Sequence, residues 1–439
     1  MGRTTMFPLP MALCVVVALA GCSTLNGNGD GDGEDAEAGS SMSETAPLDP
    51  EALDTGDYPT EPQPEFGPTD EHSILEYETQ RLAEYVALPY EIDPELSEST
   101  NVTIHTIRAG EALIGAGLNS AESALVAERG LLYGFVGGGE TETTRVTDPK
   151  KSLVTGVWRF ESPESAQAAA AAITHYMQTG EGAPEKEAAE EAEFFQPATP
   201  EELPGRPDAQ VVSMIPELDD SVERVFSFVP KGNYITYNYA ETPVGEKQWS
   251  LDTISKSLEV QEPLTEQFVG YPTKEQRGDA EPPETIIDQD NVIIYTIPTQ
   301  EDENNLDGAT MASYGPRGLA HFYEDQKALR DAVTEAGAEH TGMWGTTVFR
   351  AKSDDAAQRL LDEFLRIDSD EDFKATDSPV GLPDAKCKKN LHELGRIDVC
   401  YVLNGRYIGV AQEIDETERV HQKISAQALI LEKADQDAS

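Results

Sequence analysis

The sequence predicts an α+β protein of two tandem duplicated domains, each a largely antiparallel sheet with helices packed on one face. The first observation is that five short motifs occur twice in the same order. The second is that each copy ends in a hairpin pattern followed by a helical one, which is typical of α+β folds. In the first copy the motifs are Asn101–Ile107, Arg129–Leu131, Trp158–Gln167, Pro207–Ala209 and Gly232–Ile235. In the second copy they are Asn291–Ile297, Arg317–Leu319, Phe349–Gln358, Pro383–Ala385 and Gly405–Ile408.

The third motif of each copy predicts a helix. Ser162 and Ser353 stand where a helix N-cap is needed, and acidic residues follow in the first turn, where they favour the positive helix end. Apolar residues then recur with helical spacing and define one buried face. We therefore expect equivalent helices over Ser162–Met177 and Ser353–Ile367.

The last motif of each copy predicts a β-hairpin. Apolar runs stand on both sides of Lys231-Gly232 and of Asn404-Gly405, and short Gly-containing turns join such strands. Because side chains alternate along a strand, Tyr234 and Tyr407 should lie on equivalent faces of their sheets. A closing helix is expected near residues 251–258 and again near 420–431. The offset between matched motifs falls from 191 to 176 between the helix and the next motif, which predicts an insertion in copy one around Glu185–Phe195.

The N-terminus has the pattern of a bacterial lipoprotein signal. Arg3 precedes an apolar stretch that is too short to span a bilayer, and Leu19–Cys22 resembles a lipobox. This predicts lipidation of Cys22 and anchoring at the outer face of the plasma membrane. An ordinary secretory signal with a chance cysteine is the alternative. The expected parts are a signal peptide (1–21), an acidic tether (22–52), a first domain with an N-terminal strap and helix (53–268) and a second domain (269–439).

Charge excludes one class of function and leaves another question open. The chain of 439 residues has 82 acidic side chains and 32 Lys or Arg, for a net charge of −50. A nucleic-acid partner is excluded because phosphate affinity needs clustered basic residues. A salty habitat, solubility and repulsion from an anionic wall are all compatible with this acidity. The Gly/Asp run from Asn26 to Glu37 fits calcium-loop spacing, but its biased composition favours a plain linker.

The remaining cysteines predict a disulfide. Cys14 leaves with the signal, so an exported chain keeps only the pair Cys387 and Cys400 besides Cys22. A metal site is disfavoured because zinc needs four ligands and His392 is the only histidine nearby in the sequence. By the repeat register the pair corresponds to Val211 and Ser227, so copy one has no equivalent bridge.

Several motifs together resemble a family. These are the lipobox, Leu53–Pro62, Tyr314–Gly318, Gly381–Cys387, Cys400 and Gly405–Tyr407. In this order they resemble the secreted actinobacterial lipoproteins that have two domains of unknown function. The resemblance implies a cell-envelope lipoprotein and supplies no catalytic residues.

No linear motif for catalysis, a cofactor or a metal is present. Two pairs of arginines stand in both copies, Arg129 with Arg317 and Arg159 with Arg350. A guanidinium group captures anions and carboxylates, so these four are candidate anion-binding residues. The alternative is a structural salt bridge or backbone contact in each copy. His105 is expected to fill a partly buried aromatic position.

These observations favour a membrane-anchored extracytoplasmic protein that binds a small molecule or an envelope component and is not an enzyme. The cleft between the two copies is the expected place for a ligand. The alternative is a cell-envelope hydrolase whose carboxylate or serine site leaves no linear motif.

Overall fold

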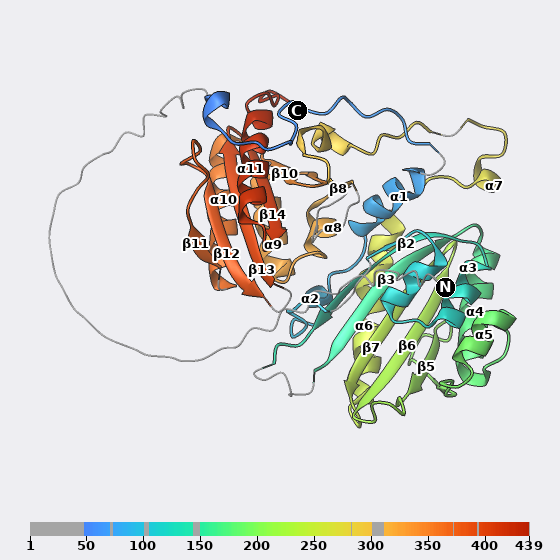
Figure 1. Cartoon of the computed structure of the whole chain (residues 1–439). Coiled ribbons are helices and arrows are strands. Elements are labelled where there is room, and N and C mark those ends of the chain that lie inside the picture. Colours follow the sequence, from blue (N-terminus) through green and yellow to red (C-terminus); the bar gives the residue numbers. More distant parts are fainter. Residues whose placement is uncertain are drawn as a thin grey trace, which may run out of the picture.

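The computed structural model describes residues 48–70, 73–100, 105–143, 150–281, 283–300, 311–371, 373–392 and 395–438. It confirms an α+β protein with two antiparallel sheets of seven strands each (Figure 1). Cys22 and the segments predicted to be a signal peptide and most of a tether lie outside the described residues. Within the described ranges, no helix is both long and apolar enough to cross a membrane.

The first sheet has the strand order β1-β2-β3-β7-β6-β5-β4. Its elements are β1 (Thr106–Ile107), η2 (Gly110–Ala116), α3 (Ser120–Ala127), β2 (Leu131–Glu140), β3 (Ser152–Phe160), α4 (Pro163–Thr179), α5 (Glu185–Glu191), β4 (Thr199–Glu201), β5 (Gln210–Met214), β6 (Val222–Lys231), β7 (Tyr234–Pro243) and α6 (Lys247–Gln267).

The second sheet has the order β8-β9-β10-β14-β13-β12-β11, which is the same topology. Its elements are β8 (Ala312–Tyr314), α8 (Pro316–Ala320), α9 (Gln326–Ala336), β9 (Thr341–Met343), β10 (Thr347–Arg350), α10 (Asp354–Asp370), β11 (Lys374–Thr376), β12 (Lys386–His392), β13 (Gly395–Asn404), β14 (Tyr407–Ile414) and α11 (Thr417–Leu431). The two sheets therefore repeat one strand topology, as the predicted duplication requires.

Six short elements lie outside the two repeats. They are η1 (Pro50–Ala52), α1 (Ser73–Ala83), α2 (Pro89–Ile92), α7 (Lys274–Arg277), η3 (Gln289–Asn291) and η4 (Ile293–Tyr295).

The capping residues behave as the sequence predicts. The Ser162 side chain accepts from the backbone N–H of Ser165 at the start of α4. The Ser353 side chain accepts from the N–H of Ala356 at the start of α10. A residue whose side chain bonds the third amide of a helix fixes where the helix begins, so the two helices start at the same point of the repeat.

The hairpins match in register and in sidedness. Trp158 lies opposite Ile235, and Phe349 opposite Ile408. Ile235 and Ile408 pack with the clusters that contain α4 and α10, so the preceding Tyr234 and Tyr407 point to the other face of each sheet. The two-residue turns are Gly232-Asn233 and Gly405-Arg406, one residue later than expected. Their glycines have φ of +57° and +55°, a region that suits glycine.

The first pair of sequence motifs is not equivalent. Residues 293–295 form the 3₁₀ turn η4, because the Asp288 carboxylate accepts from the backbone N–H groups of Val292, Ile293 and Ile294 at 2.7–3.0 Å. Strand β8 takes the place of β1 instead. The matched motifs Asn101–Ile107 and Asn291–Ile297 therefore do not form equivalent elements, although residues 101–104 lie outside the described residues.

Arg129 and Arg317 do not occupy equivalent positions either. Arg129 follows the end of α3 and precedes β2, whereas Arg317 lies in α8, directly after β8. The shared Arg-Gly-Leu triplets therefore do not mark the same place in the repeat.

Helices cover both faces of each sheet rather than one. In the first domain α4 packs on the side of Trp158 and Phe228, while Ile254 and Leu258 of α6 pack on the opposite side with Val225. The reason is visible in the strands: β3 is buried at nearly every position rather than at every second one. A strand that is apolar on both sides needs cover on both sides.

The insertion in copy one is confirmed. The segment between α4 and β4 comprises residues 180–198 and contains α5, whereas only residues 371–373 separate α10 from β11. Surface insertions of this kind cost little because loop-closure entropy grows slowly with length.

The disulfide between Cys387 and Cys400 is also confirmed, with the Cα atoms 4.1 Å apart. This is slightly closer than the roughly 4.4–6.8 Å that is usual for disulfides. The two residues face each other directly across β12 and β13. Val211 and Ser227 face each other at the same place in the first sheet. A bridge over this loop stabilises the fold by about 3 kcal/mol in the chain-entropy model.

The segment before α1 lies on the second domain, although we expected residues from 53 onward to belong to the first. Leu53 and Tyr58 are buried in the cluster that contains Tyr407 and Val420. The backbone N–H of Leu48, in the last part of the expected tether, donates to Glu432 at 2.7 Å. The N-terminal strap thus holds the second domain from outside its repeat.

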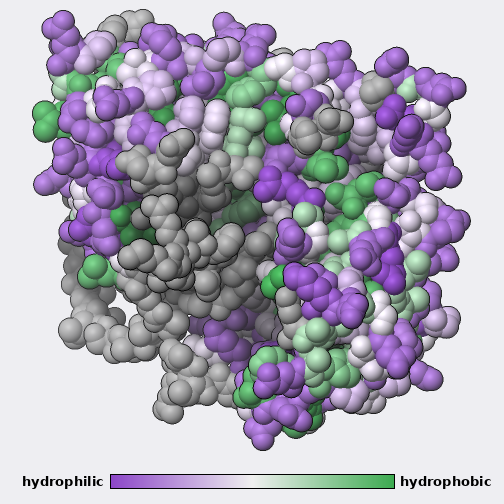
Figure 2. Space-filling model, turned by 45° about the vertical axis from the view of Figure 1, so that its right-hand side comes forward, coloured by the Kyte–Doolittle hydropathy of each residue, from purple (hydrophilic) through white to green (hydrophobic). Residues whose placement is uncertain are grey.

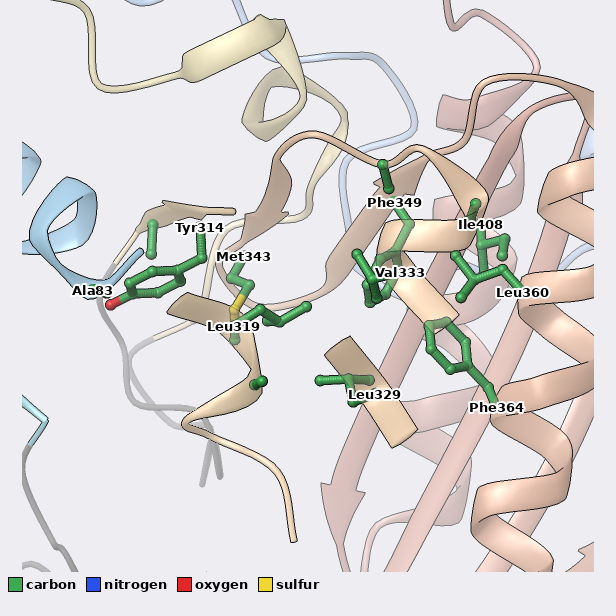
Figure 3. Packing of buried hydrophobic residues seen from close by; sticks show 14 of the residues in the cluster. Ala83, Tyr314, Leu319, Leu329, Val333, Met343, Phe349, Leu360, Phe364 and Ile408 are labelled. Carbon is green, nitrogen blue, oxygen red and sulfur yellow. The ribbon is translucent and has the colours of Figure 1, made fainter. Parts of the chain in front are cut away.

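The two domains share one apolar core. It joins Leu82 and Val86 of the α1 region and Phe135 of β2 to Leu319 and Phe349 of the second domain. Figure 3 shows Tyr314 beside Ala83 at one end of this cluster. Because the contact is apolar and continuous, the two domains form a single unit.

We predict that Gly137→Ala weakens the contact between the domains. A Cβ at Gly137 would lie 2.0 Å from Nδ1 of the buried His321 ring, so the ring or the strand must move. Overpacking of this kind costs about 1–3 kcal/mol of unfolding free energy. Urea unfolding measures the loss. Gly67→Ala is the matched control, because a Cβ there meets nothing within 4 Å. Equal stabilities of the two variants would contradict the prediction.

Candidate anion-binding site

A cavity of about 210 Å³ opens at one end of the second sheet. Its lining residues are Asp290, Gly337, Glu339, His340, Arg350, Lys352, Arg406 and Ala438. The sheet brings these distant residues together because β9 begins, β10 ends and the turn between β13 and β14 lies at this same end. Three Lys or Arg side chains and two carboxylates therefore surround one small space.

Arg350 forms the buried part of the cavity. Its side chain is 9% exposed, and its Nη1 donates to the backbone carbonyl of Asp290 at 3.0 Å. Its Nη2 lies 4.0 Å from the Asp290 carboxylate. Asp290 and Asn291 adopt φ of +64° and +52°, an uncommon conformation for residues with side chains. This turn places Asp290 beside the arginine.

The other basic groups are held by backbone carbonyls. Arg406 donates from Nε to the carbonyl of Ala351 and from Nη1 to that of Ala438, both at 2.7 Å. Lys352 donates to the carbonyl of Glu335 at 2.6 Å. His340 contacts the Asp290 carboxylate through Nδ1 at 2.5 Å. Within the described residues, the side-chain hydrogen bonds of Arg406 and Lys352 go to neutral carbonyl groups rather than to carboxylates, which favours an anion in the cavity.

The first domain shows which of these residues the fold itself needs. Arg159 corresponds to Arg350 by the sheet register. Arg159 lies opposite Tyr234, the first residue of β7, and Arg350 lies opposite Tyr407, the first residue of β14. The guanidinium group of Arg159 stacks 4.6 Å from the centre of the Tyr234 ring, and its Nη2 donates to Gln276 at 3.1 Å. The shared arginine is therefore part of the common scaffold.

The remaining cations occur in the second domain alone. The backbone contact of Phe160 with Asn233 corresponds to that of Ala351 with Arg406, so asparagine replaces arginine in copy one. By the same register Glu161 stands in place of Lys352. The fold does not require basic residues at these two positions, which separates them from the scaffold.

The structure does not bring the four candidate arginines together. Arg129 donates to the carbonyl of Leu125 at 2.8 Å, a contact within one helix end. Arg317 pairs with Glu91, and its backbone N–H donates to Glu84 at 2.9 Å. Of the four, Arg350 lines the cavity described above. Sequence reasoning missed Lys352, Arg406 and Asp290, although the first two differ in charge from their repeat partners.

The expected cleft between the two copies is occupied by packed side chains. His105 lies there with its ring centre 4.7 Å from that of Phe322 and 5.8 Å from that of Phe135. Burial lowers the pKa of His105 to about 4 and that of His321 well below its ordinary value. These neutral histidines, of which His321 is buried and His105 partly buried, belong to the interface. The cavity lies elsewhere, on the second domain.

Carboxyl groups of both domains gather beside this interface. Burial and the negative charges of Glu324, Asp368, Asp325 and Glu98 raise the pKa of Glu371 to about 8. Burial and Glu98 raise the pKa of Glu324 to about 7. Figure 2 shows polar side chains over most of one face of the molecule, in keeping with the net charge of −50. In a chain with a net charge of −50, the three Lys and Arg side chains around the cavity are a local concentration of positive charge.

Comparison with known proteins places the chain in a family. Residues 65–278 match the N-terminal domain of unknown function DUF7373, and residues 293–434 match its C-terminal domain. The two matches together span most of the chain, which therefore belongs to this two-domain family. None of the curated proteins compared with the chain matches it.

One solved structure is similar over part of the chain. It is the extracellular domain of PknH from Mycobacterium tuberculosis, with 11% sequence identity and a TM-score of 0.29. The match covers 43% of this chain and 97% of that domain.

We predict that Glu371→Gln changes the pH dependence of stability. The folded state raises the pKa of Glu371 from 4.5 to about 8, so folding favours the protonated carboxyl group. This contribution is complete below pH 4.5 and is lost as pH rises toward 8. The variant should therefore be more stable than the wild type by roughly 1–3 kcal/mol at pH 8, with the difference vanishing near pH 4.5. Urea unfolding across this range measures it. Glu335→Gln, at an exposed position of α9, should show no such trend.

Proposed function

We propose that this protein is a lipid-anchored, extracytoplasmic binding protein whose second domain holds a small oxyanion, a phosphate or a carboxylate. The observation that carries the proposal is the group of Arg350, Lys352 and Arg406 around one cavity in a chain with a net charge of −50. An isolated basic cavity in an acidic protein concentrates the attraction for anions at one place.

The chemistry of the site fits an oxyanion of modest size. A guanidinium group presents several N–H donors in a plane and matches the oxygens of a carboxylate or phosphate. Asp290 helps to position the buried Arg350, through its backbone carbonyl and its nearby carboxylate. A cavity of about 210 Å³ accepts a small anion and excludes a polymer chain from the interior.

The divergence of the two copies supports binding over a structural role. The scaffold arginine recurs in both domains, but the outer cations Lys352 and Arg406 are replaced by Glu161 and Asn233 in the first. Charge that a fold does not need for its own stability is free to serve a ligand.

The proposed location rests on the N-terminal sequence. The lipobox at Leu19–Cys22 follows an apolar stretch of signal-peptide length. A diacylglycerol on Cys22 would hold both domains at the outer face of the plasma membrane, and the acidic segment that follows would keep them in solvent.

We expect purified protein to bind inorganic phosphate or succinate in isothermal titration calorimetry, in a buffer free of other oxyanions. Lys352→Gln removes one cation at the cavity and should weaken binding about tenfold, the loss of one charged hydrogen bond. Lys327→Gln removes an exposed lysine of the same domain, paired with Asp331, and should leave affinity unchanged. If the wild type binds neither anion, or if both variants weaken binding equally, the site is not the one we propose.

We also expect Cys22→Ala to move the protein from the membrane fraction to the soluble fraction. The thiol is the atom that would carry the lipid, and without it the anchor is lost. Cys14→Ala, a change within the apolar stretch, should leave the protein in the membrane fraction. Immunoblotting of fractions washed at high salt distinguishes them. Sedimentation of Cys22→Ala with membranes would contradict lipid anchoring.

A further inference from the structure

The second domain holds another cluster of reactive side chains, away from the anion cavity. Cys387 of β12 and Cys400 of β13 face each other across the sheet, and His421 lies above them on α11. The two sulfur atoms and a ring nitrogen of His421 all lie within 4.8 Å of one another. Their positions come from three different elements, so the sequence spacing alone did not reveal the group.

We propose that these three residues form a second site, which binds a soft divalent metal such as Zn²⁺ when the disulfide is reduced. A tetrahedral zinc ion with two sulfur ligands and one nitrogen ligand holds its ligand atoms about 3.5–4 Å apart. The ring nitrogen lies within 4.8 Å of both sulfur atoms. Once the disulfide is reduced, the two sulfur atoms can move apart to this separation by rotation of the cysteine side chains. Two thiolates and an imidazole are ligands that favour zinc over calcium or magnesium.

His421 has the features of a ligand that lacks its metal. Its Nε2 atom is buried and has no hydrogen-bond partner among the described residues. Buried polar atoms are nearly always bonded, so an unpartnered nitrogen on an imidazole ring that also approaches two sulfur atoms needs an explanation. A metal ion would satisfy this nitrogen.

A second cavity provides room for the fourth ligand. It has a volume of about 390 Å³ and is lined by Asp54, Pro379, Val380, Thr417, Glu418, His421, Gln422 and Ser425. Since His421 lines this cavity and also approaches both sulfur atoms, water from the cavity can complete the coordination. Three protein ligands and one open position are typical of an accessible zinc site rather than of a closed structural one.

The chemical step is balanced by a dithiol reductant. The Cys387–Cys400 bond takes up two electrons and two protons, while the dithiol loses the same number and becomes a disulfide. Metal binding then releases two protons, because each sulfur coordinates as a thiolate. The same pair of cysteines is thus either a covalent staple or a pair of metal ligands.

The first domain again separates scaffold from site. Val211 and Ser227 stand in place of the two cysteines, and the strands pair there in the same register. The fold therefore forms without sulfur at this position. The sheet is expected to persist when the disulfide is opened, which is the condition that the metal site requires.

Cobalt titration of the purified protein tests the proposal. After reduction by dithiothreitol and its removal under anaerobic conditions, one equivalent of Co²⁺ should produce a sulfur-to-cobalt charge-transfer band and the visible bands of a tetrahedral ion. Zn²⁺ should displace the cobalt and abolish both. The oxidised protein should show neither band, and His421→Ala should weaken Co²⁺ binding at least tenfold. His175→Ala, an exposed histidine of α4, is the matched control.

Three results would overturn the proposal. The first is an absence of sulfur-to-cobalt bands in reduced protein whose thiols have been counted. The second is equal affinity of the His421→Ala and His175→Ala variants, which would remove the histidine from the site. The third is loss of the native circular dichroism on reduction, in which case no preformed site exists. The Cys387→Ser/Cys400→Ser variant is the negative control. It should fold but, lacking both thiols of the site, should show no sulfur-to-cobalt band.

Discussion

The structure depends on helix α1 and the residue that follows it, whose polar side chains satisfy backbone groups of the second domain and a side-chain hydroxyl of the first. The Gln80 amide accepts from the N–H of Ser313 and donates to the carbonyl of Met311, so it completes the open edge of the second sheet. Glu84 accepts from two N–H groups at the start of α8, and Glu78 accepts from the Tyr133 hydroxyl. A buried backbone group without a partner is costly, and an uncovered sheet edge invites pairing with other chains. One helix therefore closes the edge and joins the domains.

The duplication separates what the fold needs from what it can vary. Both copies keep the capped central helix, the Gly-containing hairpin and an arginine opposite the first tyrosine of the last strand. The second copy alone has Lys352, Arg406 and the two cysteines, and both proposed sites are built from these residues. The first copy has instead the additional helix α5, and its arginine, Arg159, donates to Gln276. The second domain is therefore the one in which we place binding.

Charge is organised on two scales in this molecule. Over the whole chain, acidic residues outnumber basic ones. Beside the domain interface, burial and the repulsion of neighbouring carboxylates raise the pKa of Glu324 and Glu371. At close range, basic residues form ion pairs with specific acidic partners. Lys423 and Glu413 form a fully buried pair between α11 and β14, where removal of one partner would cost about 3–5 kcal/mol. The cavity around Arg350 differs because its outer cations contact neutral carbonyl groups.

The sequence by itself determined the elements whose causes are local. Ser162 and Ser353 cap their helices, Gly232 and Gly405 turn their hairpins, and the repeat register correctly paired the cysteines with Val211 and Ser227. Tertiary contacts decided the rest. Asp288 converts an apparent strand into 3₁₀ turns through three backbone amides, and strands buried on both sides require helices on both faces. Asp290, His340, Arg350 and Arg406 meet only because the sheet brings its loops to one end, and α1 buries polar side chains that no hydrophobic period marks. Caps and turns act within a few residues, whereas sites and interfaces join residues that are distant in the chain.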